Sequence, residues 1–327
     1  MAQMRNKKTG VLLVNLGSPD APGKRKVRRY LREFLSDPRV VNLPRSLWWF
    51  ILNFLVLPFR PGKAAKAYRK IWTEEGSPLT VLTRKLAEKL NRDAGSEFLL
   101  FKDAMRYGRP ALAEAMGSLK QQVDEIIVLP LYPQFSSTTT ASVFDVVDDE
   151  LRKGWHLPSV RFISDYHDHE AYIRAVSESI QDYWSKNGKN ELLLMSFHGL
   201  PARLTSLGDP YYHQCLTTAK LIAESLSLKE HEWKLVFQSR FGKAEWLKPY
   251  CVEVLQQLPE QGHTKIDIVC PGFAVDCLET LEEIAMANKE IFLQSGGHSY
   301  RYIPALNDSD LQSQMILQLL ELKHERL

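Results

Sequence analysis

The sequence has few cysteines, a small net charge and no long hydrophobic run. Its 327 residues include four cysteines at positions 215, 251, 270 and 277, without the even framework of a small disulfide protein or a C-x-x-C zinc pair. The net charge of +3 does not suggest a nucleic-acid partner, since groove binders carry a concentrated basic face. With 44% hydrophobic and 25% charged residues, the chain has the composition of an ordered globular protein. We expect a reducing, cytoplasmic setting and no nucleic acid.

The sequence also lacks the glycine patterns that bind nucleotides. A dinucleotide fold places G-x-G-x-x-G after its first strand, whereas residues 17–23 read GSPDAPG, with prolines where phosphate-binding amides are needed. No Walker A pattern is present. A nicotinamide or flavin site is therefore disfavoured, and a nucleotide-dependent oxidoreductase with it.

The longest apolar run is LWWFILNFLVLPF, residues 47–59, broken by Asn53 and Pro58. It falls short of the roughly 18 residues that a membrane-spanning helix needs. Its flanks are basic and contain Arg45, Arg60, Lys63, Lys66, Arg69 and Lys70. From composition alone, two interpretations stay open: a buried core helix, or a helix that lies on an anionic bilayer.

Eight short strand-like runs alternate with helical segments. These runs are residues 11–16, 98–102, 125–131, 160–164, 192–196, 234–237, 266–269 and 300–303. Such alternation predicts parallel sheets built from βαβ units. A helix over residues 171–186 would connect the first four strands to the second four. We therefore predict an α/β fold of two similar Rossmann-like domains, residues 1–168 and 169–327, each a four-stranded parallel sheet flanked by helices.

Ligands of open α/β sheets bind outside the carboxyl ends of the strands, so the residues there are candidates for chemistry. His198 follows the apolar run 192–196, and Glu279 opens a helix after the strand 266–269. A carboxylate and an imidazole at neighbouring strand ends suit either divalent-metal handling or proton abstraction. Glu283 shares the face of Glu279 at the 3.6-residue period, a pattern that any solvated amphipathic helix also shows.

Ten strings in this chain resemble the ferrochelatase family, whose members insert ferrous iron into a porphyrin. In order, they are VLLVNLGSPDAP, FLSDPRVV, GSPL, AMRYG, VLPLYPQFSSTTT, SFHGLPARL, GDPYYHQC, FQSRFG, EWLKP and CPGFAVDCLETLEEI. Each string alone is weak evidence for the family, but the occurrence of all of them in this order over residues 10–306 is specific to it. The resemblance implies two similar four-stranded domains with a cleft between them, in agreement with the strand pattern.

The resemblance also implies roles for individual residues. His198 matches the active-site histidine and Glu279 the glutamate opposite, both as catalytic residues and candidate iron ligands. Glu283 matches the next member of an acidic ladder that relays protons or metal. The implied porphyrin-binding residues are Leu16, Arg106, Tyr107, Tyr132, Gln134, Ser136, Thr138 and Trp246.

The implied reaction is insertion of ferrous iron into protoporphyrin IX, which makes protohaem and releases two protons at the last step of haem biosynthesis. His198 would accept protons or hold iron as a transient ligand, and both roles stay open. The alternatives are a coproporphyrin ferrochelatase, another tetrapyrrole chelatase and a non-catalytic porphyrin or haem carrier. Three apolar residues, Trp48, Trp49 and Phe50, favour protoporphyrin over the more carboxylated coproporphyrin.

The chain departs from other ferrochelatases at several positions. It has no cysteine after Cys277, and its cysteine spacing predicts no iron–sulfur cluster and no other cofactor, since iron is a substrate. Cys277 replaces a histidine that many members carry, and Ala287 interrupts the acidic ladder, which Glu290 continues imperfectly.

In the family, the apolar run 47–59 forms a lip at the mouth of the cleft. The resemblance therefore favours peripheral contact with the inner face of the membrane over a wholly buried helix. An exposed apolar patch also fits a dimer interface, so the oligomeric partner stays unknown.

Overall fold

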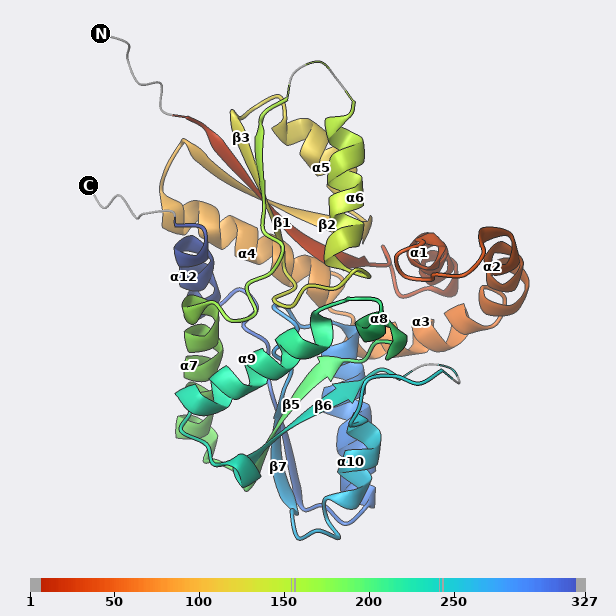
Figure 1. Ribbon diagram of the computed structural model, residues 1–327, viewed down its shortest axis with the longest axis vertical. Coiled ribbons are helices and arrows are strands. Elements are labelled where there is room, and N and C mark those ends of the chain that lie inside the picture. Colours follow the sequence, from red (N-terminus) through yellow and green to blue (C-terminus); the bar gives the residue numbers. More distant parts are fainter. Residues whose placement is uncertain (1–6, 154, 156, 241, 243, 322–327) are drawn as a thin grey trace. The chain divides into compact units, whose positions relative to one another are not determined.

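The computed structural model describes residues 7–153, 155, 157–240, 242 and 244–321 (Figure 1). Contacts within the chain divide these residues into two compact units. Unit 1 comprises residues 7–132 and 136–165, and unit 2 comprises residues 133–135 and 166–321. The division of the chain into folding domains at residue 168 stays a prediction.

Each unit contains one sheet of four parallel strands, so the predicted fold class is confirmed. In unit 1 the strand order is β2-β1-β3-β4, and in unit 2 it is β6-β5-β7-β8. The strands of unit 1 are β1 (Thr9–Ser18), β2 (Leu99–Gly108), β3 (Glu125–Pro130) and β4 (Ser159–Phe162). Those of unit 2 are β5 (Leu192–His198), β6 (Trp233–Gln238), β7 (Lys265–Val269) and β8 (Ser299–Ile303).

Helices connect successive strands, as right-handed parallel crossovers require. Those of unit 1 are α1 (Lys24–Ser36), α2 (Arg45–Ile51), the π-helix η1 (Leu52–Val56), α3 (Arg60–Ile71), α4 (Pro78–Ala94), α5 (Leu112–Leu119) and α6 (Thr140–Leu151). Those of unit 2 are α7 (Glu170–Asn187), α8 (Arg203–Ser206), α9 (Tyr211–Ser225), the 3₁₀ turn η2 (Glu230–Glu232), α10 (Cys251–Gln257), the π-helix η3 (Glu279–Asn288), α11 (Lys289–Gln294) and α12 (Asp310–Leu319). The predicted connecting helix 171–186 is α7.

The central strands are apolar on both sides because helices cover both faces of each sheet. In β1, residues 11–14 are fully buried. Leu12 and Val14 face a core cluster contributed by α5 and α6, while α4 packs against β1 and β2. In unit 2, Leu192 and Leu194 of β5 join a cluster with residues of α10, η3 and α11. Double-sided burial explains why these strands read as continuous hydrophobic runs rather than alternating ones.

The helix that carries the candidate glutamates differs from the prediction. Residues 279–288 form a π-helix, with i→i+5 hydrogen bonds in place of the expected 3.6-residue period. Glu279 and Glu283 lie in η3, whereas Glu290 is exposed in α11 and accepts a hydrogen bond from Gln294. The expected 3.6-residue period is therefore wrong for the segment that carries Glu279 and Glu283, and the helix changes type before Glu290.

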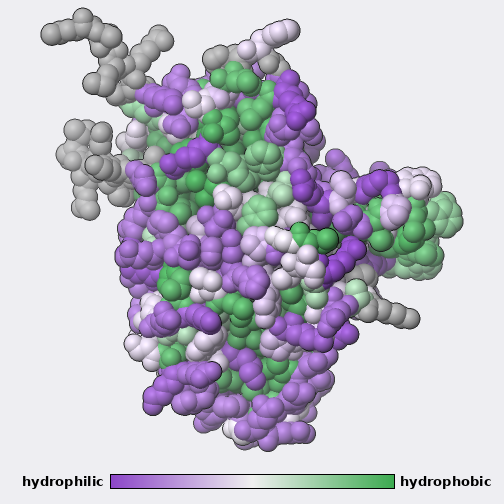
Figure 2. Space-filling view, in the orientation of Figure 1, coloured by the Kyte–Doolittle hydropathy of each residue, from purple (hydrophilic) through white to green (hydrophobic). Residues whose placement is uncertain are grey.

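The apolar run 47–59 folds into α2 and η1 and exposes much of its surface. Six large side chains are between 53% and 76% exposed, namely Leu47, Trp49, Phe50, Phe54, Leu55 and Phe59. Leu52 and Leu57 are buried and attach the segment to unit 1. Figure 2 shows hydrophobic residues gathered over the segment that carries α2. A wholly buried helix is thus excluded, and we call the six exposed side chains the apolar lip.

Among the described residues, none of the helices is both long and apolar enough to cross a bilayer.

Candidate active site

His198 is the last residue of β5, and its ring is half-buried. Its Nδ1 lies 2.7 Å from the backbone oxygen of Gly199. Because a carbonyl oxygen only accepts, Nδ1 carries the proton, and the neutral ring then has its lone pair on Nε2. A neutral imidazole held in this tautomer can accept a proton or bind a metal ion at Nε2.

Glycine is required immediately after His198 because the backbone passes very close to β6. A Cβ at Gly199 would lie 2.6 Å from the backbone oxygen of Gln238 and 3.3 Å from Cε3 of Trp246. The Gly199 amide donates to that same Gln238 oxygen at 2.8 Å. The chain therefore ends the apolar strand at His198 and turns over Trp246, one of the predicted porphyrin-binding residues. The buried indole Nε1 of Trp246 has no hydrogen-bond partner among the described residues.

Glu283 is held by both polar groups of Ser239. The Ser239 amide donates to Oε1 at 2.7 Å, and the Ser239 hydroxyl donates to Oε2 at 2.5 Å. Burial raises the pKa of Glu283 above its ordinary value, although these hydrogen bonds, and the positive charge that His198 carries when protonated, oppose that effect. The nearby Glu279 carboxylate raises it further. The charges of His198 and Glu279 thus both act on the Glu283 carboxyl within unit 2.

Ser239 adopts a backbone conformation that its sequence position did not reveal. It lies at φ +64°, in the left-handed region that non-glycine residues rarely occupy. This conformation directs both the amide and the hydroxyl of Ser239 toward Glu283. The only sequence signal was the polar string QSRFG at the end of β6, and it did not indicate which side chain Ser239 would hold.

Gln238 connects the elements that carry the two candidate catalytic residues. It is buried, and its Cα pairs with that of His198 across β5 and β6. Its Nε2 donates to the backbone oxygen of Glu279 at 3.1 Å, and its Oε1 accepts from the hydroxyl of Ser196 at 2.8 Å. The first turn of η3 is therefore tied to the end of β5 through one amide side chain.

We predict that Gln238→Leu separates these elements while keeping a similar volume. Each buried group left without a partner costs about 1–3 kcal/mol, so the free energy of unfolding should fall by about 2–5 kcal/mol. The kcat for iron insertion should fall about 10- to 100-fold, because small misplacements of reacting groups are costly. Denaturant unfolding and steady-state assays measure both, with Gln256→Leu on the exposed face of α10 as the control. Wild-type values for the Gln238 variant would contradict the prediction.

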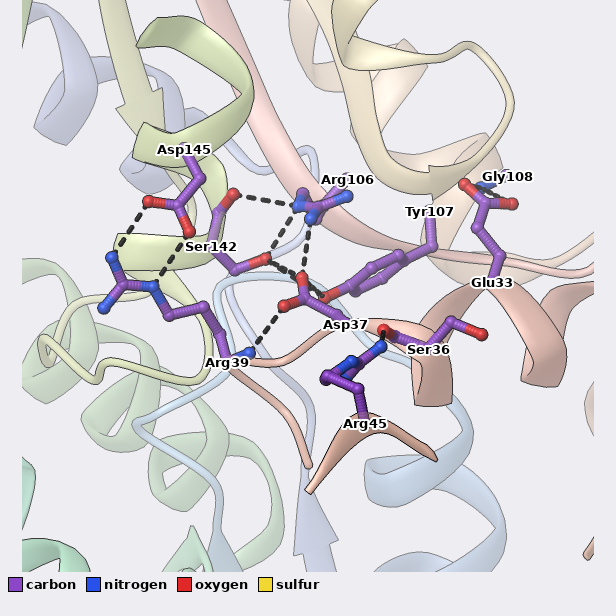
Figure 3. Close-up of polar contacts among 10 residues, drawn as sticks. All are labelled: Glu33, Ser36, Asp37, Arg39, Arg45, Arg106, Tyr107, Gly108, Ser142 and Asp145. Carbon is purple, nitrogen blue, oxygen red and sulfur yellow. Dashed lines mark hydrogen bonds and ion pairs between the residues drawn. The ribbon is translucent and has the colours of Figure 1, made fainter. Parts of the chain in front are cut away.

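Arg106 and Tyr107, predicted to bind porphyrin, belong to a polar network around Asp37 in unit 1 (Figure 3). Arg106 Nη2 donates to Asp37 Oδ2 at 2.6 Å, and the Tyr107 hydroxyl donates to the same oxygen at 2.7 Å. The Ser142 hydroxyl adds a third donor at 2.6 Å, and the Arg39 amide donates to Oδ1 at 2.7 Å. Asp37 lies within the string FLSDPRVV, and the sequence alone predicted no role for it.

The other predicted porphyrin-binding residues fall in both units. Leu16 is half-buried near the end of β1, and Tyr132 packs beside the hydrophobic core of unit 1. Ser136 and Thr138 share a hydrogen bond of 2.9 Å just before α6. Gln134 belongs to unit 2, where it is buried and donates to Thr218 at 3.0 Å.

The four cysteines are buried and free of disulfide bonds. Burial raises the pKa of each thiol, which disfavours the thiolate that a metal ligand needs. Cys277 lies beside Glu279. It is position 277 at which the family resemblance leads us to expect a histidine.

Solved structures of other proteins share the fold. SirB from Bacillus subtilis with Fe3+ matches with a TM-score of 0.57 and 13% identity, covering 97% of this chain and 96% of that one. The sirohydrochlorin chelatase SirB from Bacillus subtilis subspecies spizizenii, in complex with cobalt, matches with a TM-score of 0.53, 12% identity and the same coverage. These likenesses show the class of fold, namely two parallel four-stranded sheets flanked by helices, and in this chain a histidine and two glutamates lie near the strand ends.

Sequence comparison identifies the particular family. The ferrochelatase family model matches residues 8–324. The ferrochelatase of Methylococcus capsulatus is 54% identical over 96% of this chain and 96% of its own length. The ferrochelatase of a Janthinobacterium species is 50% identical over 96% of this chain and 86% of its own length. The chain belongs to the ferrochelatase family and is an enzyme that inserts iron into protoporphyrin in haem biosynthesis.

Proposed function

We propose that His198 accepts the pyrrole protons when this enzyme inserts ferrous iron into protoporphyrin IX. The observation that carries the proposal is the hydrogen bond from Nδ1 to the Gly199 oxygen, which leaves Nε2 able to take a proton. Two N–H protons must leave the macrocycle for each iron that enters. An imidazole fixed at the end of a strand, with Nε2 able to accept a proton, is suited to remove them.

Glu279 and Glu283 would support this proton transfer. A carboxylate near His198 stabilises the imidazolium that forms when the ring is protonated. The raised pKa of Glu283 brings this carboxyl closer to neutral pH and suits it to receive a proton and release it to solvent. Oxygen and nitrogen donors also fit a transient site for hydrated ferrous iron, since an iron bound too firmly would not transfer. The proposal includes no resident cofactor and no iron–sulfur cluster.

The porphyrin contacts are proposed by family resemblance for Leu16, Tyr132, Gln134, Ser136, Thr138 and Trp246. Arg106 and Tyr107 would act differently, because their polar groups are already bonded to Asp37 and Ser142. We assign them a supporting role in which they hold the end of β2.

An anaerobic insertion assay tests the proposed reaction. Purified protein is mixed with ferrous iron and either protoporphyrin or coproporphyrin, and metalloporphyrin absorbance is followed. We expect turnover with protoporphyrin at a kcat/KM well above that with coproporphyrin. A preference for coproporphyrin would contradict the proposed substrate, and porphyrin binding without turnover would indicate a carrier.

We propose further that the apolar lip makes a peripheral contact with the inner face of the membrane. Its exposed aromatic and leucine side chains form one group, in which Trp49 and Phe50 both lie against Phe54. Several cations flank the run in the sequence, a combination that favours binding at a bilayer surface. The protoporphyrin substrate is itself largely apolar, so a surface site would suit its delivery.

The triple variant Trp49→Ser, Phe50→Ser and Phe54→Ser tests the membrane contact. Because these side chains are exposed, stability should change little, whereas partition onto lipid vesicles should fall at least about 100-fold. Vesicle co-sedimentation measures the effect, and Leu207→Ser, another exposed apolar residue, serves as the control. Unchanged vesicle binding, with loss of a dimer in sedimentation velocity, would instead identify the lip as an oligomer interface.

A further inference from the structure

The positive charge of the chain is concentrated in one part of unit 1. Residues 24–70 contain thirteen lysines and arginines but two acidic residues, Glu33 and Asp37. The rest of the chain holds 29 cationic and 37 acidic residues, so it is net negative although the whole chain carries +3. Such an asymmetry within one segment indicates an anionic partner for that surface.

Helix α1 presents this charge as a nearly uniform face. Val27 and Tyr30 are its buried residues, and they lie on the side opposite most of the cations. Five exposed cations project from the other side at helical spacing, namely Lys24, Arg25, Arg28, Arg29 and Arg32. Among the described residues, none of the five has an ion-pair or hydrogen-bond partner, in contrast to Lys26, which pairs with Asp20 at 3.0 Å. Unpaired like charges on adjacent turns repel one another, so this face gains from a negatively charged neighbour.

The cationic face adjoins the apolar lip. Helix α1 packs against α3 and η1, and the indole of Trp48 donates to the backbone oxygen of Leu35 near the end of α1 at 2.6 Å. The guanidinium of Arg45 donates to the Ser36 oxygen beside it. An acidic protein would complement the charges alone, whereas a bilayer with anionic headgroups complements both the charges and the apolar lip.

We propose that the cationic face of α1 binds anionic phospholipid headgroups and makes membrane docking selective for anionic bilayers. The inference rests on the proposed membrane contact of the apolar lip and adds a second element to it. Electrostatic attraction acts over about 10 Å at 0.1 M salt and would recruit the enzyme before the lip side chains insert.

The variant Arg25→Gln, Arg28→Gln and Arg32→Gln tests the proposal in the full-length enzyme. Its binding to vesicles of phosphatidylcholine with phosphatidylglycerol should weaken about 100-fold, since each of the three cations near an anionic surface contributes about fivefold. Binding to vesicles of phosphatidylcholine alone should not change, nor should the insertion rate with detergent-dispersed porphyrin. The control variant neutralises three exposed lysines of unit 2, Lys186, Lys220 and Lys265, and should keep wild-type binding.

The lip variant separates this proposal from the membrane contact on which it rests. If the lip variant keeps anionic binding while the arginine variant loses it, the lip contact fails and the α1 contact stands. Equal loss in the arginine and lysine variants would overturn the α1 proposal, because net charge alone would then explain binding. Undiminished anionic binding by the arginine variant would overturn it as well, as would wild-type enzyme that binds neither vesicle.

Discussion

Replacing His198 with alanine is expected to lower the kcat for iron insertion by about 10²- to 10⁴-fold, the usual contribution of a positioned general base. The imidazole is the proposed base, fixed at the end of β5, and its Nδ1 is held by the Gly199 oxygen. Alanine leaves the backbone hydrogen bond between Gly199 and Gln238 available, so the local fold should persist. Porphyrin affinity should stay within a few-fold of wild type, because the proposed porphyrin contacts are made by residues other than His198.

The matched control is His213→Ala, which removes an exposed histidine from α9 in the same unit and should leave kcat unchanged. Porphyrin binding is followed by fluorescence quenching and insertion by absorbance under anaerobic conditions. Added imidazole that partly restores the rate of His198→Ala would support proton acceptance by the ring. A kcat within threefold of wild type would show that His198 is neither the base nor a required iron ligand.

Replacing Asp37 with alanine is expected to lower the free energy of unfolding by about 3–5 kcal/mol, the cost of breaking a buried ion pair from one side. The change would leave the guanidinium of Arg106 without its carboxylate and the hydroxyls of Tyr107 and Ser142 without their acceptor. Since the chain leaves Asp37 toward α2, the apolar lip should also become more mobile. The matched control is Asp145→Ala, because the Asp145 pair with Arg39 is exposed and contributes about 1 kcal/mol or less.

The contribution of Asp37 to the free energy of unfolding should also depend on pH. Burial alone would raise the pKa of Asp37, but hydrogen bonds from Ser142, Tyr107 and the Arg39 amide, with the charge of Arg106, lower it below 3.8. A lowered pKa in the folded state gives stability that is complete above the unfolded value and is lost as pH falls through the folded value. The difference in unfolding free energy between wild type and Asp37→Ala should therefore be constant near neutrality and shrink below about pH 4. Urea unfolding over pH 3 to 7 measures it, and a difference that grows on acidification would contradict this origin.

Most of the fold could be predicted from the sequence. A parallel strand buried on both faces is a continuous hydrophobic run, which can be recognised without knowing which strands lie next to it. All eight predicted strands are present, and the helix expected at 171–186 is α7. Strand ends were harder to place. The predicted strand 98–102 in fact continues to Gly108, because Met105, Tyr107 and Gly108 pair along β1. Arg106 and Tyr107 in this extension also serve the Asp37 network.

For the apolar run 47–59, composition alone could not predict whether the helix is buried or exposed. A buried helix and a surface helix can have the same residues, and the exposed fractions of Trp49, Phe50 and Phe59 decided between them. Hydrophobicity measures what a side chain prefers, whereas exposure depends on whether another element covers it.

The sequence by itself determined the two parallel sheets, the delivery of His198 to a strand end and the family to which the chain belongs. The tertiary structure decided which polar groups meet. Ser239 reaches Glu283 through a left-handed backbone, Gln238 joins β5 to η3, and Asp37 collects donors from residues as far as 105 positions away. The physical reason is that hydrophobic periodicity is a local property of the chain, whereas a hydrogen bond between distant residues depends on backbone geometry that forms with the packed core.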